Sequence, residues 1–283
     1  MSLPLDVRSI ALACAVAHLA VAIAMTYVRI SRKTYDGFGA WALSAWCAFL
    51  GILLVALRGF ISDAWSILAA NLFLVGTSSL ILTGLVAFSG GRPNHRMHAV
   101  FLTVYTLLTA LFLYAIPSLQ ARLVVFSFAI GALGLLSAHV AWKRLPAVLH
   151  DANPLVLGTI LFVAIVYLLR SLLSLAIPPP SEDFMAAAPV QGISLLVYLL
   201  GHTTLSVALL VLNGQRVERD LQVSIEECKV LRGILPICAH CKKIRDNQGA
   251  WNQIEAYLHQ HTEAEFSHGI CPECAQTAFG REI

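Results

Sequence analysis

Seven long apolar stretches, none containing an acidic residue, constrain the fold of this chain more than any other feature. A helix needs roughly 20 apolar residues to cross the hydrocarbon core of a bilayer. The segments between the stretches carry turn chemistry, such as Asp36-Gly37 and Asn153-Pro154. The pattern predicts an all-α integral membrane protein with a bundle of seven transmembrane helices. The stretches cover about residues 7–28, 38–57, 64–88, 99–116, 121–142, 155–177 and 190–212.

The composition agrees with a chain that lies mostly in lipid. Hydrophobic residues make up 58% of the 283 residues and charged residues only 12%, whereas about a quarter of a soluble domain is charged. The length allows one membrane domain, residues 1–212, and one small appended module. We therefore expect residues 213–234 to form a linker helix and residues 235–283 to form a separate module.

Basic residues in the breaks between the stretches predict the topology. The second, fourth and sixth breaks hold or adjoin only Arg58 and Arg122, and the sixth is acidic at Glu182 and Asp183. Basic residues favour the cytoplasmic side. The odd-numbered breaks are therefore predicted to be cytoplasmic, with the N-terminus outside and the C-terminus inside. The first, third and fifth breaks hold Arg29, Arg32, Lys33, Arg92, Arg96, Lys143 and Arg144.

The segment after the last apolar stretch is charged and helical in character. Five positions, with the polar Ser224 among them, follow a 3,4,3,4 spacing, close to a heptad seam. One reading is a short coiled coil that pairs two copies of the chain in a homodimer, and the other is a solvated linker helix. The seam runs through Leu221, Ser224, Cys228, Leu231 and Leu235.

Two Cys-x-x-Cys pairs near the C-terminus are the strongest chemical signal. Cys238 and Cys241 precede Cys271 and Cys274, with 29 residues between the pairs. Two such turns aim four sulfurs at one ion, as in structural zinc sites. Cytoplasmic thiols stay reduced, which favours metal ligands over disulfides. The alternatives are a redox-active dithiol pair or unliganded thiols.

The tail module is too small to bury enough surface to fold stably on its own, and the free energy of zinc binding would stabilise its fold. A short helix near 250–260 is expected to pack on the site through Trp251, Ile254, Tyr257 and Leu258. His240 and His268 are spare ligands, and three cysteines with His268 form a second arrangement. We predict a zinc-ribbon-like fold with a structural zinc ion.

The charge of the tail argues against nucleic acid as a partner. From Asn213 to the end there are 8 Lys or Arg and 10 Asp or Glu residues, so the tail lacks the positive field that phosphate backbones require.

The tail also resembles a known module. It reads LPICAHCKKIRD from Leu235, then Gly249-Ala250-Trp251, then EFSHGICPEC from Glu265. This run of about 45 residues closely resembles a short C-terminal module that ends many bacterial signalling proteins. The resemblance implies bacterial signal transduction. We further expect a location in the bacterial inner membrane and a cytoplasmic signalling protein as the partner. Ala250 departs from the family, where an aromatic residue is common.

The membrane half resembles, more loosely, the multi-span sensory region found ahead of bacterial diguanylate cyclases. The chain has no Gly-Gly-Asp-Glu-Phe run, no His-box and no Gly-rich nucleotide motif. We therefore expect no enzymatic activity. The residues that carry this resemblance are Trp41, Leu57-Arg58, Asn71, Gly84, Phe88 and Arg170.

Polar residues at membrane depth are candidate functional residues. Arg170 lies about seven residues inside span six, roughly 10 Å deep at 1.5 Å per residue. Arg170 either snorkels outward, hydrogen-bonds to Asn71 or to backbone carbonyls, or binds an anionic ligand. Asn71 is more simply interpreted as a side chain that hydrogen-bonds between neighbouring helices.

Three histidines also lie in the predicted spans. His18, His139 and His202 are interpreted first as hydrogen-bonded bundle residues, with haem ligation or proton relay as the alternative.

These observations favour a membrane-embedded sensor or signalling adaptor with no catalytic domain of its own. A transporter or channel is the first alternative, although no apolar stretch holds the acidic residues that usually couple ions. A haem-binding electron-transfer protein using the span histidines is the second alternative.

Overall fold

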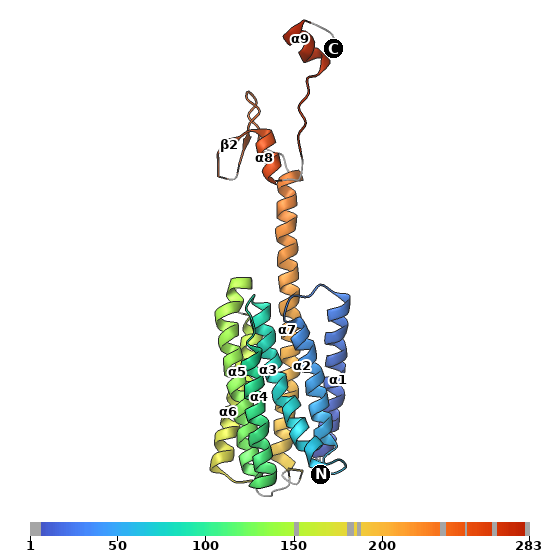
Figure 1. Ribbon diagram of the computed structural model, residues 1–283, viewed down its shortest axis with the longest axis vertical. Coiled ribbons are helices and arrows are strands. Elements are labelled where there is room, and N and C mark those ends of the chain that lie inside the picture. Colours follow the sequence, from blue (N-terminus) through green and yellow to red (C-terminus); the bar gives the residue numbers. More distant parts are fainter. Residues whose placement is uncertain are drawn as a thin grey trace, which may run out of the picture. The chain divides into compact units, whose positions relative to one another are not determined.

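The computed structural model describes residues 7–149, 153–179, 184–185, 188–232, 236–246, 248–261 and 265–280. Contacts divide the chain into two units, Met1–Arg219 and Asp220–Ile283. The first unit is a bundle of long helices, and the second carries short elements of the tail (Figure 1).

The prediction of seven spans is confirmed, because the described residues contain seven helices long and apolar enough to cross a membrane. Two of them contain a π-helical segment, labelled η. The helices are α1 (Val7–Ser31), α2 (Phe38–Ala56), η1 (Ala64–Ala69) running into α3 (Ala70–Phe88), α4 (His95–Ala110) running into η2 (Leu111–Ala115), α5 (Leu119–Leu149), α6 (Pro154–Ala176) and α7 (Ala188–Arg232).

Helix ends follow the capping chemistry of the sequence. Asn153 accepts hydrogen bonds from the backbone N–H groups of Leu155 and Val156, and Pro154 occupies the first turn of α6. Asn94 accepts from Met97 N–H at 3.1 Å and starts α4 at His95. This α4 start lies before the predicted apolar stretch, because the cap extends the helix into polar residues.

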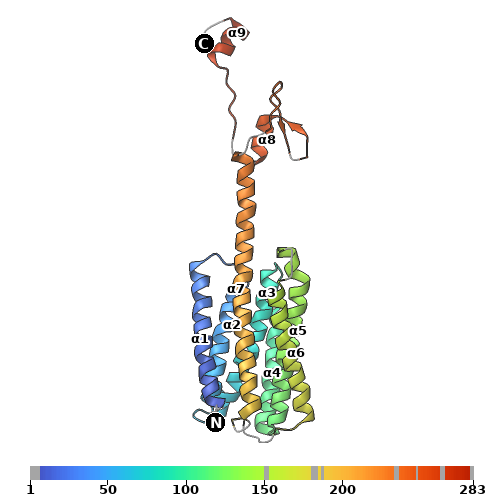
Figure 2. The ribbon, with the colours of Figure 1, turned by 180° about the vertical axis from the view of Figure 1, so that it is seen from behind.

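The helices pack in an order that closes the bundle. Contacts join α1 to α2, α2 to α3, α3 to α5 and α5 to α6, while α4 lies against α3 and α5. Helix α7 contacts α6 through the Tyr167 hydroxyl, which donates to the Ser194 carbonyl at 3.2 Å. It contacts α1 through the rings of His18 and His202. Figure 2 shows α7 running between α1 and α6.

The outer surface of the bundle is apolar, as a lipid-facing surface requires. On α6, Phe162, Leu169 and Leu173 are exposed. Contiguous exposed apolar surface on this scale is rare in water-soluble monomers. The seven helices therefore carry large apolar side chains on the outside of the bundle as well as in its core.

One glycine allows a close approach inside the bundle. Gly84 of α3 packs against the indole of Trp41, and a Cβ at this position would overlap the ring. The Trp41 Nε1–H donates to the Ile81 carbonyl at 3.3 Å. Trp41 is fully buried, so the space left by Gly84 determines where α2 and α3 meet.

Helix α7 turns several buried polar side chains into the bundle. Gln191, His202, Ser206 and Asn213 are all buried. Asn213 donates to the Lys33 carbonyl and accepts from Tyr35 N–H, at 3.1 and 3.2 Å. These contacts tie α7 to the segment between α1 and α2.

In the second unit, β1 (Ile244–Arg245) and β2 (Trp251–Asn252) form an antiparallel pair, followed by α8 (Ile254–His261) and α9 (Pro272–Phe279). The helix expected near 250–260 is confirmed in part. It begins only at Ile254, and Trp251 lies in β2. The reason is local, since Asp246 accepts from Gln248 N–H and Ala250 N–H and bends the chain into a hairpin.

Candidate functional site

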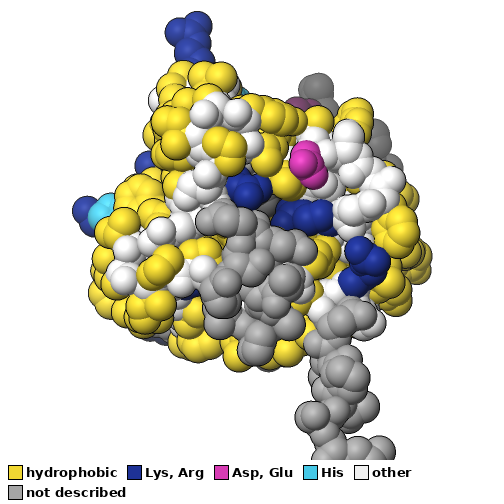
Figure 3. Space-filling model, turned by 90° about the horizontal axis from the view of Figure 1, so that it is seen from below, with side chains coloured by type: hydrophobic (Ala, Val, Ile, Leu, Met, Phe, Trp, Pro, Cys, Tyr) yellow, Lys and Arg dark blue, Asp and Glu magenta, His cyan; other side chains and the backbone are white. Residues whose placement is uncertain are grey.

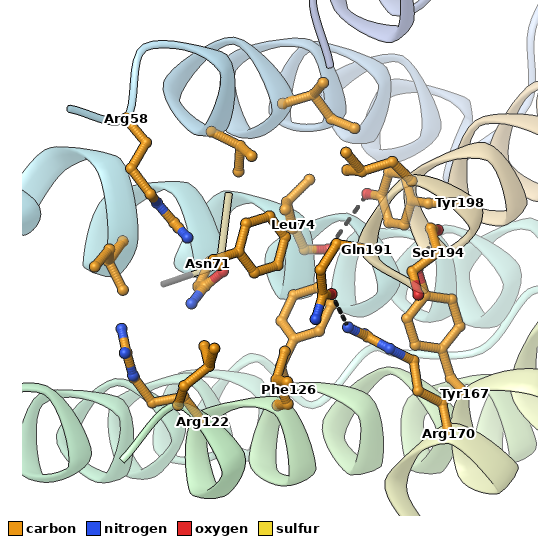
Figure 4. A pocket seen from close by; sticks show the side chains of 17 residues that line it. Arg58, Asn71, Leu74, Arg122, Phe126, Tyr167, Arg170, Gln191, Ser194 and Tyr198 are labelled. Atoms are coloured by element: carbon orange, nitrogen blue, oxygen red, sulfur yellow. Dashed lines mark hydrogen bonds between the residues drawn. The ribbon is translucent and has the colours of Figure 1, made fainter. Parts of the chain in front are cut away.

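A cavity of about 60 Å³ lies within the bundle, enclosed by α2, η1, α3, α5, α6 and α7. It is near the end of the bundle where α1 and α7 begin. Apolar side chains form most of the wall, and three arginines and two amides supply its charge and polarity (Figure 4). The lining residues are Ile52, Val55, Arg58, Ile67, Asn71, Leu74, Leu119, Arg122, Leu123, Phe126, Tyr167, Arg170, Phe184, Gln191, Ser194, Leu195 and Tyr198.

Arg170 of α6 ties three helices together at the cavity. Its Nη1 donates to Ser127 Oγ of α5 at 3.2 Å, and its Nη2 donates to Gln191 Oε1 of α7 at 2.7 Å. The guanidinium also lies 5.9 Å from the centroid of the Tyr167 ring. A charged donor makes a stronger hydrogen bond than a neutral one, so Arg170 fixes the side chain of Gln191 in the wall.

Arg58 enters the cavity from the end of α2, and its position depends on the π-helical turn that follows. Its Nη2 donates to the Ser66 carbonyl of η1 at 3.0 Å. Its own carbonyl accepts from Arg8 Nη2 at 3.0 Å. Short π-helical segments inside α-helices often lie at functional sites. Here η1 presents a backbone acceptor to an arginine of the cavity.

Arg122 enters from the first turn of α5, where its Nε donates to the Ser118 carbonyl at 3.3 Å. Figure 4 shows the guanidinium groups of Arg58 and Arg122 pointing toward one another beside Asn71, while Arg170 points toward Gln191. Lys and Arg side chains gather near the middle of this end of the bundle (Figure 3). The cavity therefore has positive groups on several sides.

The structure brings the two predicted polar residues, Arg170 and Asn71, to one cavity. The described hydrogen bonds of Arg170 go to Ser127 and Gln191, and its guanidinium points into the bundle rather than outward. Sequence reasoning missed Arg58, Arg122 and Gln191. A signal for the two arginines was present, since they are the basic residues in the even-numbered breaks, against the positive-inside pattern.

Two of the span histidines meet in the bundle interior. The rings of His18 and His202 lie 5.1 Å apart, and Tyr198 is stacked on His202 at 6.1 Å. His18 Nδ1 is 2.7 Å from the Cys14 carbonyl. A carbonyl only accepts, so Nδ1 is the donor in this contact. Within the described part of the chain, His18 Nε2 and both ring nitrogens of His202 have no hydrogen-bond partner.

The remaining span residues of chemical interest are His139, Cys14 and Cys47. His139 is exposed on the outside of α5, so it does not join His18 and His202. Cys14 is buried and Cys47 is partly buried, each as a free thiol. A buried cysteine of this kind acts as a small apolar packing residue.

In the tail, the first Cys-x-x-Cys pair forms one tight turn. Cys238 N–H donates to the Lys243 carbonyl at 2.8 Å, and Lys242 N–H donates to the Cys238 carbonyl at 2.9 Å. Lys242 has a φ of 60°, the left-handed conformation that closes the turn. The backbone N–H of Cys241 holds the pKa of the Cys238 thiol below its usual value. The turn is therefore shaped to stabilise a thiolate.

The second pair repeats this arrangement at the start of α9. Cys271 precedes the helix, Pro272 occupies its first turn, and the backbone N–H of Cys274 lowers the pKa of the Cys271 thiol. Thiolates next to backbone N–H groups are the form in which cysteines bind zinc. The donor chemistry of both pairs thus fits the predicted ion.

The described residues do not assemble the four cysteines around one point. No group of three or more His, Cys, Asp or Glu side chains in the described ranges could hold a metal ion. His240 and His268, the spare ligands, are both exposed. The zinc site and its ligand set remain predictions.

Comparison with known proteins adds no relative. No protein-family model, no curated protein and no solved structure matches the chain.

Proposed function

We propose that this protein is a bacterial membrane sensor or signalling adaptor with no catalytic domain of its own. The observation that carries the proposal is the extent of α7. Gln191 of α7 lines the arginine cavity, and the same helix continues to Arg232, just before the cysteine module. One secondary-structure element thus belongs both to a binding cavity and to the segment that leads to the tail.

The proposed signal is a change in how α7 is held at the cavity. Arg170 binds Gln191 directly, and Tyr167 donates to the Ser194 carbonyl on the same helix. A ligand that competes for Arg170 would alter these contacts. Such a ligand shifts the bundle between two states only if it binds one of them more tightly.

The proposed output is the cysteine module, which would engage a cytoplasmic signalling protein. Cys238, Cys241, Cys271 and Cys274 would hold one zinc ion. The ion would supply folding free energy to a module too small to be stable alone. This proposal rests on the thiolate-stabilising turns and on the resemblance of the tail to the module of bacterial signalling proteins.

The proposed location is the bacterial inner membrane, with the N-terminus outside and the tail in the cytoplasm. The support is the distribution of basic residues, because those in the odd-numbered breaks outnumber those in the even-numbered breaks by seven to two. In this orientation the arginine cavity lies toward the outer side of the membrane.

Crosslinking in native membranes tests the sensor proposal. The full chain, a chain that stops after residue 234, and an Arg170→Gln variant would each be crosslinked and recovered. We expect a cytoplasmic kinase, cyclase or regulator with the full chain and not with the shortened one. We also expect Arg170→Gln to change the amount recovered.

Arg96→Gln is the matched control, because Arg96 is exposed at the start of α4 and outside the cavity. It should leave recovery of the partner unchanged. Recovery of the same partners without the tail would contradict the proposal, as would equal recovery with Arg170→Gln and the unaltered chain.

A further inference from the structure

A groove on the outside of the bundle lies apart from the arginine cavity. It has a volume of about 1310 Å³ and is lined by α2, α3, α4 and the loops that precede α2 and α4. The described lining residues of the groove and of the arginine cavity are entirely different. Sites for small metabolites usually measure roughly 300–1,000 Å³, so the groove suits a larger ligand.

Helix α3 forms the floor of the groove. Its lining residues Phe73, Gly76, Leu80, Thr83 and Ala87 recur every three or four positions, which places them on one face of the helix. From Phe73 to Ala87 this face is about 21 Å long at 1.5 Å per residue. Half of the hydrocarbon core of a bilayer is only about 15 Å deep. The floor therefore runs through more than one leaflet.

The walls of the groove are apolar along the floor and open to the surroundings. Helix α2 contributes Ala40, Leu43 and Cys47, and α4 contributes Ala99 and Leu102. Both helices pack on α3. Leu43 and Ala99 are exposed. A long apolar ligand could enter the groove sideways from the lipid.

The polar side chains beside the floor are bonded within the protein. Ser79 Oγ lies 2.7 Å from His98 Nδ1, and Thr83 Oγ1 donates to the Ser79 carbonyl at 2.9 Å. These contacts link α3 to α4 and leave mainly apolar surface for a ligand in the middle of the groove.

One end of the groove is polar and holds two arginines from different elements. Arg29 lies in the last turn of α1, and its guanidinium covers Gly39 of α2, where a Cβ would meet it. Arg92 lies in the loop between α3 and α4. Both arginines line the groove and are exposed. An anion at this end would meet guanidinium donors from two sides.

We infer that the groove binds one anionic phospholipid, with its phosphate at Arg29 and Arg92 and an acyl chain along the floor of α3. The inference goes beyond the proposed sensor and does not depend on it. Guanidinium groups bind phosphate oxygens through paired N–H donors. A free phosphate would use the polar end and leave the apolar floor uncovered, whereas a lipid accounts for both parts.

Charge selects the class of lipid. Asp36 lies at the same end as Arg29 and Arg92, so these described lining residues carry one net positive charge. The single negative charge of phosphatidylglycerol offsets it, whereas phosphatidylethanolamine is zwitterionic and has no net charge to offer. In the predicted topology this end faces the cytoplasmic leaflet, where anionic lipids attract arginines near the membrane surface.

Native mass spectrometry of the full chain, released from micelles that contain phosphatidylglycerol or phosphatidylethanolamine, tests the headgroup contact. We expect one phosphatidylglycerol to be retained and phosphatidylethanolamine to bind about fivefold more weakly. Arg29→Gln and Arg92→Gln should each weaken phosphatidylglycerol binding about fivefold. Lys143→Gln is the matched control, because Lys143 is exposed on α5 and outside the groove lining. Equal binding of the two lipids, or unchanged binding in both arginine variants, would overturn the inference.

A larger side chain at Gly76 tests the path of the acyl chain. A Cβ on Gly76 would meet no atom within 4 Å, so Gly76→Leu places its side chain in the groove. We expect this variant to lose the bound phosphatidylglycerol. Gly158→Leu is the matched control, because Gly158 of α6 also has open space around its Cβ position and is exposed outside the groove. Full retention of the lipid in Gly76→Leu would overturn the inference.

The same spectra report whether a second copy of the chain fills the groove instead. A dimer that carries no lipid and is lost in Gly76→Leu would overturn the lipid site and assign the groove to pairing of two chains. If Gly76→Leu fails to fold, Ala99→Leu takes its place, because Ala99 is exposed on the α4 wall of the groove. Lipid retained in full by a folded Ala99→Leu would likewise overturn the inference.

Discussion

The imidazole rings of His18 and His202 lie 5.1 Å apart in the bundle, and neither ring nitrogen of His202 has a hydrogen-bond partner among the described residues. An unsatisfied buried polar group costs about 1–3 kcal/mol. A second cavity, of about 50 Å³, adjoins His202, so a slightly larger apolar ring can be accommodated. We predict that His202→Phe raises the unfolding temperature of the purified protein.

The same variant tests the haem alternative. The purified chain should show no visible absorption band, and His202→Phe should leave the spectrum unchanged. A band that disappears in this variant, together with a lower unfolding temperature, would show that the two histidines hold a cofactor. His139→Phe is the matched control, because His139 is exposed on α5, whereas His18 and His202 are buried on α1 and α7.

Gly84 and Gly76 of α3 form a natural pair for testing the contact with Trp41. A Cβ on Gly84 would overlap the indole, whereas a Cβ on Gly76 would meet no atom within 4 Å. We predict that Gly84→Ala lowers the free energy of unfolding by about 1–3 kcal/mol through overpacking. Gly76→Ala should be neutral or stabilising by up to about 1 kcal/mol, as expected for alanine in a helix. Equilibrium unfolding in mixed micelles would measure both, and equal effects would refute the packing argument.

The zinc proposal makes a stoichiometric prediction. Elemental analysis of the purified full chain should find about one zinc ion per chain, as a single tetrahedral site requires. Cys271→Ser should abolish the zinc and open the tail to limited proteolysis, while the bundle stays folded. His240→Ala should retain the ion. Loss of zinc in His268→Ala would instead assign three cysteines and His268 as ligands, and zinc near zero in the unaltered chain would remove the metal.

Asp246 makes the hairpin of the tail sensitive to acid. The pKa of its carboxyl is lowered, first by the backbone N–H of Ala250 and then by the amide of Asn252. A depressed pKa means that the carboxylate stabilises the hairpin above the ordinary aspartate pKa of about 3.9. This contribution is lost as the pH falls through the lower pKa of the folded state.

Hydrogen exchange at Ala250 in the full chain measures this effect. We predict that protection at Ala250 falls as the pH drops below about 4, the ordinary range of an aspartate. In Asp246→Asn, protection should be weaker at neutral pH and should not change over that range. An identical pH profile in both proteins would show that another group controls the turn.

Most of the fold was predictable because bilayer solvation acts on composition alone. A helix that spans the membrane needs a long uncharged run, and each of the seven runs became a helix. The sequence predicted a boundary between the last span and the linker helix at Asn213. The structure has no helix end there, since α7 runs through Asn213 without interruption. Trp251 was misplaced because apolar spacing at 250–258 suits a helix, whereas the hydrogen bonds of Asp246 impose a strand before Ile254.

The candidate site was predictable only in part. Arg170 and Asn71 stood out because polar residues are costly at membrane depth. Arg58 was noted only as part of the resemblance to sensory regions, Arg122 only as a basic residue beside a break, and Gln191 only as part of the last span. Their convergence depends on how α2, α5 and α7 pack around the cavity, which the sequence of each helix does not encode by itself.

The π-helical turn at Ala64–Ala69 gives this site an unusual evolutionary sensitivity. Such a turn bonds each N–H five residues back, so it accommodates a residue that an α-helix would not. Deleting one residue there would restore α geometry and remove the widened turn that presents the Ser66 carbonyl. Arg58 would lose the Ser66 acceptor. A one-codon deletion could thus alter what descendants of this protein recognise while sparing the surface that meets the lipid.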